Sequence, residues 1–420
     1  MFEETLLKLY KNIKPDTLEN IIPIINGIRK FKKKPPISTK EKLCKYDLPD
    51  FRKEKVIMIH GVSVGEIMSL EKLIKRVKEF FPDYKLVVTA GTKTGLELAR
   101  KKYAQIADFI CYFPLDIYEV VDKFLTFINP KAILIAETEL WPNFALCAKE
   151  KNIELYIING RISDKSYSSY LKLKKFFRLI LNSYSGIFCQ SEIDKTRFLE
   201  LCEDKNKVQV MKNLKFEIDK KPCDIDLFKG KSKVLIAAST HKGEDEIAFW
   251  AYKKLAKKIP NLKLILAPRH LNRVEDVITL AKKFNLKYGL RTQNDNFSSV
   301  DVLILDTLGE LSKIYSTVDV AYIGGSFNKT GGHNPLEAVI YSKPCVSGPS
   351  IKNFRDIYSI LTREKASFVV KNKNEFYKLL EKLLSNDVFY QQTVRNCHLC
   401  FKNQQGALSF VINKLNEVLK

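Results

Sequence analysis

The chain has 420 residues, 45% of them hydrophobic, and a formal net charge of +23. This length predicts two or three domains with sizeable cores, and the charge suits nucleic acid, anionic lipid or a phosphorylated substrate. The nine cysteines include one closely spaced pair, Cys397 and Cys400, but no second pair to complete a site, which disfavours a disulfide scaffold or zinc site and favours a reducing compartment. Charges interrupt the first 15 positions, and no window approaches about 18 apolar residues, so we expect no secretory signal and no spanning helix.

Residues 1–50 are the least regular part of the sequence, and they contain a basic cluster at residues 29–34, which read RKFKKK. Beside an amphipathic stretch, such a cluster suits the surface of an anionic membrane. A solvated basic linker leading into Pro35-Pro36 fits the same residues. We treat 1–50 as a separate N-terminal basic and amphipathic segment.

Residues 51–205 alternate between apolar runs and helical patterns, which predicts a parallel, doubly wound sheet. The expected strands lie at residues 56–59, 85–89, 132–136, 155–158 and 186–190.

The stretch HGVSVGE at residues 60–66 joins the first of these strands to a helix that we expect to begin between Ser63 and Glu66. The carboxyl ends of strands are where open α/β sheets bind ligands, and the free N–H groups of a helix start favour an anion. Two interpretations of Glu66 fit this position. It is either a general base that the helix start keeps ionised, or a residue that caps the helix.

Further polar residues follow the later strands of this half. Glu137 and Glu139 are two apart in extended chain and therefore share a face, where they either hold a sugar hydroxyl or pair with nearby cations. Arg161 lies in a polar, basic turn suited to an anionic acceptor. With Ser63, these residues are our candidates for binding an acceptor.

Residues 206–232 are polar and irregular, and we predict a domain linker there. Asp224 and Asp226 resemble a metal-binding acidic pair, but their place in a linker leads us to predict no metal. A second alternating series occupies 233–400, with strands expected at 234–238, 262–267, 302–305 and 320–323. We expect helices over about 374–384 and 406–420 to finish the fold, the last of them within a C-terminal segment, 401–420.

The strand ends of the second series are polar or rich in glycine, which favours a nucleotide site. Glycines let backbone N–H groups approach a phosphate, and Arg269 can contact it with two hydrogen bonds. Glu337, one turn into its helix, is placed to accept hydrogen bonds from ribose hydroxyls. Two doubly wound, Rossmann-like domains facing a central cleft are the α/β architecture of GT-B glycosyltransferases, with acceptor and base on the first domain and nucleotide donor on the second.

The ordered motifs from about residue 56 to 360 resemble those of the bacterial 3-deoxy-D-manno-octulosonic acid (Kdo) transferases of lipopolysaccharide synthesis. These motifs are HGVSVGE at 60–66, ETELWPN at 137–143, NGRIS at 159–163, NLKF at 213–216, ASTH at 238–241 with Gly243-Glu244, APRH at 267–270, GEL at 309–311, GGS at 324–326 and GGHN at 331–334.

The resemblance implies an inverting transfer of Kdo from CMP-Kdo to a hydroxyl of the lipid A precursor (lipid IVA), without metal or other cofactor, at the cytoplasmic face of the inner membrane. It places the general base on Glu66. Together with the strand-end residues, it gives the expected donor-binding set: Ser239, Thr240, Arg269, Gly309, Glu310, Gly325, Asn334 and Glu337. The expected partners are CMP-Kdo, the lipid A precursor and an anionic membrane surface, with no nucleic acid.

Three departures from the family's pattern are visible. Residues 1–34 are too charged for the family's usual apolar anchor, so we expect peripheral membrane attachment. Met211-Lys212 stand where the family tends to have Thr-Gly, and Leu271 replaces a proline.

Two alternative hypotheses assign the chain a different function. Another GT-B enzyme, such as a UDP-sugar hexosyltransferase or an epimerase, would keep the fold and prefer UDP-sugars. A basic nucleic-acid or membrane-surface binder without catalysis would leave the ordered strand-end motifs without a purpose.

Overall fold

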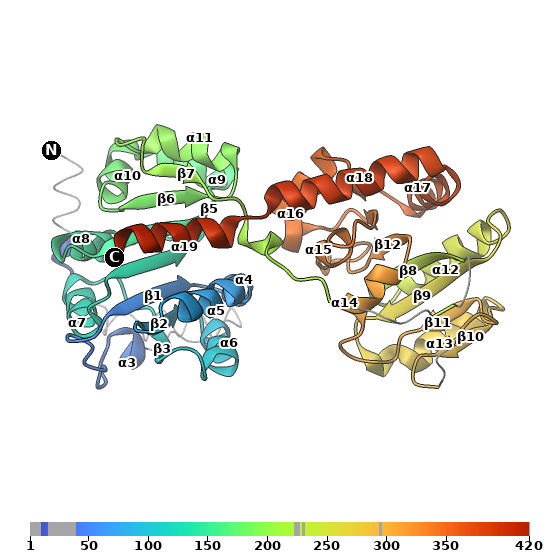
Figure 1. The fold of residues 1–420 in the computed structure, drawn as a ribbon, viewed down its shortest axis with the longest axis horizontal. Coiled ribbons are helices and arrows are strands. Elements are labelled where there is room, and N and C mark those ends of the chain that lie inside the picture. The colour runs from blue at the N-terminus through green and yellow to red at the C-terminus, as the bar shows by residue number, and fades with distance from the viewer. Residues whose placement is uncertain (1–9, 16–38, 222–226, 229–231, 294–295, 420) are drawn as a thin grey trace. The chain divides into compact units, whose positions relative to one another are not determined.

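The computed structural model describes residues 10–15, 39–221, 227–228, 232–293 and 296–419. The basic cluster at 29–34 and the pair Asp224 and Asp226 lie outside the described residues. The chain divides into two compact units, one formed by residues 1–217 with 405–420 and the other by residues 218–404 (Figure 1).

The first unit contains a seven-stranded sheet in which every described pairing is parallel. In spatial order its strands are β3 (Phe109–Tyr112), β2 (Lys85–Ala90), β1 (Val56–Gly61), β4 (Ala132–Ala136), β5 (Glu154–Gly160), β6 (Gly186–Cys189) and β7 (Val208–Val210). The chain lays β2 and β3 on one side of β1 and then returns to place β4 on the other side. The switch point of this sheet, where such folds bind ligands, therefore lies between the ends of β1 and β4.

Helices cover both faces of the first sheet. They are α3 (Thr39–Lys42), α4 (Val64–Ser69), α5 (Glu71–Phe80), α6 (Lys93–Tyr103), α7 (Tyr118–Ile128), α8 (Pro142–Glu150), α9 (Asp164–Lys172), α10 (Lys174–Leu181), α11 (Glu192–Leu201), the 3₁₀ turn η1 (Leu214–Phe216) and α19 (Ala407–Val418). Because side chains alternate along a strand, Met58 packs into one core while Ile57 and Ile59 pack into the other. Val411 and Leu415 of α19 pack into the same core of the first unit as Ile57 and Ile59, and α19 lies beside α5 (Figure 1).

The second unit repeats this plan. In spatial order its parallel strands are β10 (Tyr288–Leu290), β11 (Val302–Ile304), β9 (Leu262–Pro268), β8 (Lys233–Thr240), β12 (Val320–Ile323), β13 (Cys345–Ser347) and β14 (Ser367–Val369). Its helices are α12 (Glu244–Leu255), η2 (Leu271–Arg273), α13 (Val274–Lys283), α14 (Leu311–Ile314), η3 (Tyr315–Thr317), α15 (Leu336–Val339), η4 (Lys352–Phe354), α16 (Arg355–Arg363), α17 (Lys373–Ser385) and α18 (Asp387–Gln404). The switch point of this sheet lies between β8 and β12.

The strands expected from the sequence all form, but five others were not expected. These are β3, β7, β10, β13 and β14, and each has only three or four residues. Length alone is not the reason, since β6, β11 and β12 are as short and were expected. Four of the five, β3, β7, β10 and β14, lie at the edges of their sheets, where pairing with one neighbour stabilises them.

The boundaries differ from the expected ones in two places. Residues 206–217, which we predicted as linker, contain β7 and η1 and belong to the first unit. The last helix begins at Ala407, close to the expected residue 406, but the segment boundary expected at 401 falls inside α18, which continues to Gln404 before Gly406 turns the chain with φ 114°. Glu217 accepts hydrogen bonds from the N–H groups of Gly406 (2.7 Å) and Leu408 (3.4 Å), which ties the helix start to the first unit.

The departure at Lys212 has a structural consequence. Lys212 has a positive φ of 71°, which is costly for a residue with a side chain and natural for the glycine that the family tends to have there. Its Nζ donates to the Gln405 carbonyl at 2.9 Å. This contact links the strained turn to the returning C-terminal segment.

None of the described helices is both long and apolar enough to cross a membrane. The eight described cysteines are all buried and unpaired, as expected for small core residues.

Candidate active site

Three carboxylates gather at the switch point of the first sheet. Glu66 follows β1, whereas Glu137 and Glu139 follow β4, the strand that pairs with β1. The charge of Glu66 raises the pKa of Glu139, and the charge of Glu137 raises the pKa of Glu66 and of Glu139. The sheet therefore brings together, at one edge, carboxylates that lie some 70 residues apart in sequence.

Glu66 makes the contacts of a helix cap. Ser63 is the N-cap residue of α4, and its hydroxyl accepts from the Glu66 N–H at 3.5 Å and donates to Glu66 Oε1 at 2.8 Å. Glu66 Oε2 accepts from the Val62 N–H at 2.7 Å. Each carboxylate oxygen retains capacity for a further hydrogen bond, because it can accept two. Capping and proton acceptance are therefore compatible at this residue.

The environment of Glu66 raises its proton affinity. Burial is the largest cause of a raised pKa for this half-buried carboxyl, and the charge of Glu137 acts in the same direction. The hydrogen bonds from Val62 and Ser63 act against these two effects. A base whose pKa is closer to neutrality than an ordinary glutamate is a better proton acceptor at pH 7.

Glu137 and Glu139 differ in their surroundings. Glu137 adopts a positive φ of 59° and lies 3.9 Å from the Lys215 Nζ, which supports the ion-pair interpretation for this residue. Burial, and then the charges of Glu66 and Glu137, raise the pKa of Glu139 to about 7. At neutral pH Glu139 is therefore partly protonated, and it can donate as well as accept a hydrogen bond.

Backbone hydrogen bonds hold the segments that carry Arg161 and Lys215 at this edge of the sheet. The Arg161 N–H donates to the Thr138 hydroxyl at 3.1 Å, which fixes the end of β5 beside the segment between the two glutamates. Asn159 Oδ1 accepts from the Leu214 N–H at 3.0 Å and thereby holds the turn that carries Lys215. Sequence reasoning missed Lys215, although the motif NLKF contains it. Only the sheet shows that this motif faces the strand end of β4.

At the switch point of the second sheet, a buried carboxylate holds the glycine loop. Glu244 is 1% exposed. Its Oε1 accepts from the Ser326 N–H (2.8 Å), the Phe327 N–H (2.8 Å) and the Tyr322 hydroxyl (2.9 Å), and its Oε2 accepts from the Gly325 N–H (2.7 Å) and the His241 N–H (3.0 Å). The Gly325 amide, which we expected to be available to a phosphate, is therefore bonded within the protein. Sequence reasoning gave Glu244 no role.

The loop after β8 is fixed by a second buried acid. The Thr240 hydroxyl donates to Asp245 Oδ1 at 2.6 Å, and Arg273 pairs with Asp245 and donates to the Thr240 carbonyl at 2.9 Å. The Arg269 N–H donates to the same carbonyl at 2.9 Å. Thr240 is therefore a structural residue through its side chain. Arg269 has its backbone held while its side chain is exposed, and the neighbouring Ser239 adopts a positive φ of 55°.

Three histidines, none of which was predicted as a site residue, cluster beside Arg269. His241 Nε2 lies 2.9 Å from His333 Nε2, so one of these nitrogens donates a proton and the other accepts it. The His270 ring centroid is 5.8 Å from that of His241. Burial, and then the charge of Arg269, lower the pKa of His333 to about 4. Each histidine belongs to one of the motifs ASTH, APRH and GGHN, which was the available signal.

The remaining predicted donor residues lie at the ends of β11 and β12. Glu337 is half-buried, and burial raises its pKa while the charges of Lys221 and Arg269 lower it. Asn334 Oδ1 accepts from the Leu336 N–H at 3.1 Å, in the turn that precedes α15. Gly309 has a φ of 85°, and Glu310 pairs with Arg291 at 3.3 Å. Arg269, Glu337 and the histidines thus form one group, and the Gly309-Glu310 turn follows β11.

Among the described residues, no group of three or more His, Cys, Asp and Glu side chains has the arrangement of a metal site. The side chains present suit hydrogen bonding and charge stabilisation of an anionic ligand.

Two seven-stranded, Rossmann-like units define a protein of the GT-B class. The fold is similar to that of UDP-GlcNAc 2-epimerase from Neisseria meningitidis bound to UDP-GlcNAc, with a TM-score of 0.55 and 14% identity over 86% of this chain and 100% of that chain. It is also similar to a glycosyltransferase from Rickettsia africae, with a TM-score of 0.51 and 12% identity over 87% of this chain and 99% of that chain.

The sequence comparisons identify the family within this class. The model of the 3-deoxy-D-manno-octulosonic-acid transferases (kdotransferases) matches residues 38–218. The 3-deoxy-D-manno-octulosonic acid transferase of Haemophilus influenzae is 31% identical over 87% of both chains, and that of Rickettsia felis is 34% identical over 87% of this chain and 79% of the relative. The chain therefore belongs to the Kdo transferase family.

A relative with a longer chain is a bifunctional glycosyltransferase/methyltransferase of Fusobacterium nucleatum. It is 38% identical over 347 residues, which are 80% of this chain and 53% of that protein. The present chain thus spans about half the length of that relative.

Proposed function

We propose that the protein is an inverting glycosyltransferase that moves Kdo from CMP-Kdo to a hydroxyl of the lipid A precursor lipid IVA, an early step of lipopolysaccharide inner-core synthesis. The observation that carries the proposal is the placement of Glu66 at the switch point of the first unit, in a chain that belongs to the Kdo transferase family. The setting would be the cytoplasmic face of the inner membrane, with peripheral attachment to its anionic surface.

In the proposed reaction Glu66 takes the proton of the acceptor hydroxyl. The acceptor oxygen forms a bond to the anomeric carbon of Kdo as the bond from that carbon to the CMP phosphate oxygen breaks. CMP leaves with the electron pair, and a single displacement of this kind inverts the anomeric centre. The raised pKa of Glu66 supports this role, because a weak carboxylate base would return the proton too readily.

The acceptor is proposed to lie against Ser63, Glu137, Glu139 and Arg161. The hydroxyl of Ser63 also orients the Glu66 carboxylate, since it bonds Oε1 at 2.8 Å. Because Glu139 has a pKa of about 7, its protonated form can donate to a sugar oxygen. Arg161 supplies positive charge for an acceptor that carries phosphate.

The donor is proposed to bind the second unit. The exposed side chain of Arg269 would contact the phosphate and stabilise the charge that develops as CMP leaves. Glu337 would accept from the ribose, and Ser239, Gly309, Glu310 and Asn334 would complete the site. Since Glu244 occupies the Gly325 amide and Asp245 occupies the Thr240 hydroxyl, we assign Gly325 and Thr240 the task of shaping the loops around the donor.

The test is CMP release from CMP-Kdo with lipid IVA, comparing the unaltered chain with Glu66→Gln. The matched control is Glu79→Gln, which alters an exposed glutamate on the following helix. We expect Glu66→Gln to lower kcat about a hundredfold or more and Glu79→Gln to leave it unchanged. Thermal unfolding of both variants separates loss of the base from loss of the cap.

Three results would contradict parts of the proposal. Near-full kcat in Glu66→Gln would reduce Glu66 to a cap, and the base would then be sought at Glu137 or Glu139. Consumption of a UDP-sugar but not CMP-Kdo would remove the Kdo assignment while leaving the GT-B fold intact. Retention of the anomeric configuration in the product would exclude single displacement.

A further inference from the structure

The helix pair α9 and α10 of the first unit presents an unusual surface, which we call the α9–α10 surface and define as residues 164–181. None of the nine residues of α9 is buried. Leu171 and Leu173, at the junction of the two helices, are 36% and 52% exposed. A large part of the apolar surface of these two leucines is therefore left uncovered by the described residues.

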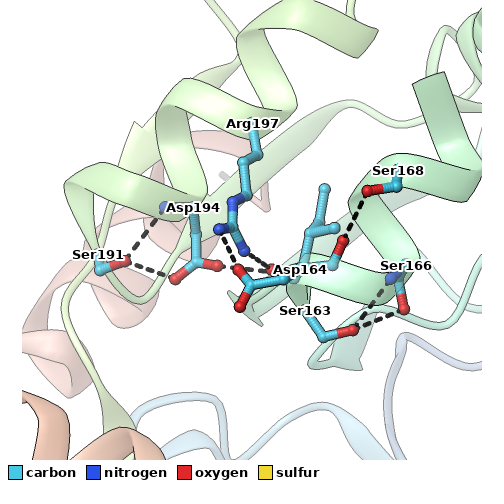
Figure 2. A network of polar contacts seen from close by, with 8 residues as sticks. Ser163, Asp164, Ser166, Ser168, Ser191, Asp194 and Arg197 are labelled. Carbon is cyan, nitrogen blue, oxygen red and sulfur yellow. Dashed lines mark hydrogen bonds and ion pairs between the residues drawn. The ribbon is translucent and has the colours of Figure 1, made fainter.

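Polar contacts fix the start of α9 (Figure 2), while the partly buried Tyr167 and Tyr170 pack its inner side against the core of the first unit. Asp194 of α11 accepts from the Ile162 N–H at 2.9 Å, and Ser191 caps α11 beside it. Arg197 donates to the Ile162 carbonyl and pairs with Asp164. Figure 2 shows Arg197 and Asp194 reaching from α11 to the beginning of α9, so the start of this helix is fixed to α11.

The charge of this surface is strongly positive. Its 18 residues contain five basic side chains and one acidic side chain, Asp164, which Arg197 already neutralises. The four lysines are Lys165, Lys172, Lys174 and Lys175. None of these four forms an ion pair within the part of the chain that the structure describes. Unpaired lysines around exposed leucines are the composition of a helix that lies at a membrane interface, where lysine stems cover apolar surface and their charges meet lipid phosphates.

The surface adjoins the carboxylates of the candidate active site. Tyr170 of α9 packs on Phe177 of α10 with ring centroids 4.2 Å apart, and both rings lie against the core of the first unit. Burial, and then the charge of Glu139, raise the pKa of Tyr170. Trp141, two residues after Glu139, is 37% exposed, and tryptophan favours the boundary between lipid and water.

We propose that the α9–α10 surface docks the protein on an anionic lipid bilayer, with Leu171 and Leu173 entering the interface and the lysines contacting lipid phosphates. Bilayer binding follows from the surface alone. The benefit for catalysis rests on the proposed function, because a lipid acceptor held in the same bilayer would then meet Glu139 and Glu66 without leaving it.

The experiment measures partition of the full chain onto vesicles of phosphatidylcholine with 30% phosphatidylglycerol, using sedimentation at low and physiological salt. Two variants alter the surface, Leu171→Ser with Leu173→Ser, and a triple change of Lys172, Lys174 and Lys175 to Gln. The matched controls alter exposed residues of the second unit, namely Val388→Ser with Leu399→Ser, and a triple change of Lys257, Lys282 and Lys283 to Gln. Circular dichroism checks that each variant folds.

We expect the unaltered protein to bind these vesicles and to bind pure phosphatidylcholine at least about tenfold more weakly. The lysine variant should lower the partition coefficient on the order of a hundredfold, since each basic residue near an anionic leaflet contributes about fivefold. The leucine variant should lower it about tenfold, because the lost apolar area is small. Higher salt should weaken binding of the unaltered chain.

The proposal is overturned if the unaltered chain ignores anionic vesicles, or if each control variant loses as much binding as its surface counterpart. It is also overturned if the unaltered chain is a dimer that the leucine variant dissociates, since the surface would then be an interface between copies. Measurements of CMP release with lipid IVA in vesicles and with a water-soluble deacylated acceptor separate the docking proposal from the proposed function. Docking is supported if the leucine variant transfers less to the vesicle-bound acceptor but normally to the soluble one. If the unaltered chain transfers to neither acceptor, the proposed function is refuted, and the vesicle-binding result is unaffected.

Discussion

Replacement of the buried Glu244 by glutamine should destabilise the second unit, because its carboxylate holds the glycine loop. The two carboxylate oxygens together accept five hydrogen bonds, three at Oε1 and two at Oε2. Glutamine has nearly the same shape but only one side-chain oxygen, and its NH₂ group donates instead of accepting. The best placement keeps the oxygen at the three donors and turns the NH₂ towards the N–H groups of Gly325 and His241.

Two buried donors then lose their acceptor. Each buried donor left unsatisfied costs about 1–3 kcal/mol, so Glu244→Gln should destabilise the second unit by about 2–6 kcal/mol. The control is Glu246→Gln, which changes an exposed glutamate in the same first turn of α12 and should alter the free energy of unfolding by less than about 0.5 kcal/mol.

The assay is urea unfolding followed by tryptophan fluorescence. The chain contains two tryptophans, Trp141 in the first unit and Trp250 in the second, so a Trp141→Phe background leaves Trp250 as the reporter of the second unit. Glu244→Gln should lower the urea midpoint without changing the slope of the transition. A loss below about 1 kcal/mol, or one equal to that of Glu246→Gln, would refute the reasoning that this carboxylate holds the glycine loop.

Three further predictions use the same measurements. Because folded Glu139 keeps its proton up to about pH 7 and the unfolded chain releases it near pH 4.5, stability should fall by about 2 kcal/mol as the pH rises through this window, and Glu139→Gln should abolish that fall. The pKa of His333 is lowered from 6.5 to about 4, so stability should fall as the pH drops from 6.5 to 4, a loss that His333→Gln should remove; equal slopes in variant and unaltered chain would contradict it. Gly324→Ala should destabilise the protein by several kcal/mol, because its Cβ would lie 2.5 Å from the Ser239 carbonyl oxygen. Gly309→Ala, which has open space at φ 85°, should cost only about 1 kcal/mol. Similar unfolding midpoints for the two variants would contradict this prediction and show that the backbone at Gly324 shifts.

The sequence by itself determined the central strands of both units. A fully buried parallel strand carries a continuous apolar run, so the centres of β1, β4 and β8 were predictable from residue type alone. Residue order also predicted that polar loops follow these strands, and the ordered motifs indicated the family to which the chain belongs. The cleft expected between the two units stays a prediction.

Only the tertiary structure decided which of these loops meet. Glu66 and Glu137 come together because β4 pairs with β1 and not with β3, and no local pattern encodes that pairing. The same reason explains why Lys215 was missed, since its motif faces Glu137 only once β7 pairs with β6 and η1 follows it. Contacts between residues far apart in sequence depend on strand order, which periodicity does not contain.

The glycine loop shows the same division between sequence and structure. The sequence shows glycines at 324 and 325, which we interpreted as giving a phosphate access to backbone N–H groups; the structure adds that a side chain at Gly324 would strike the Ser239 carbonyl. It did not show that Glu244, 80 residues earlier, would accept the loop's N–H groups in place of a phosphate. A buried amide must find an acceptor, and folding alone determined that the acceptor is a carboxylate of the protein itself.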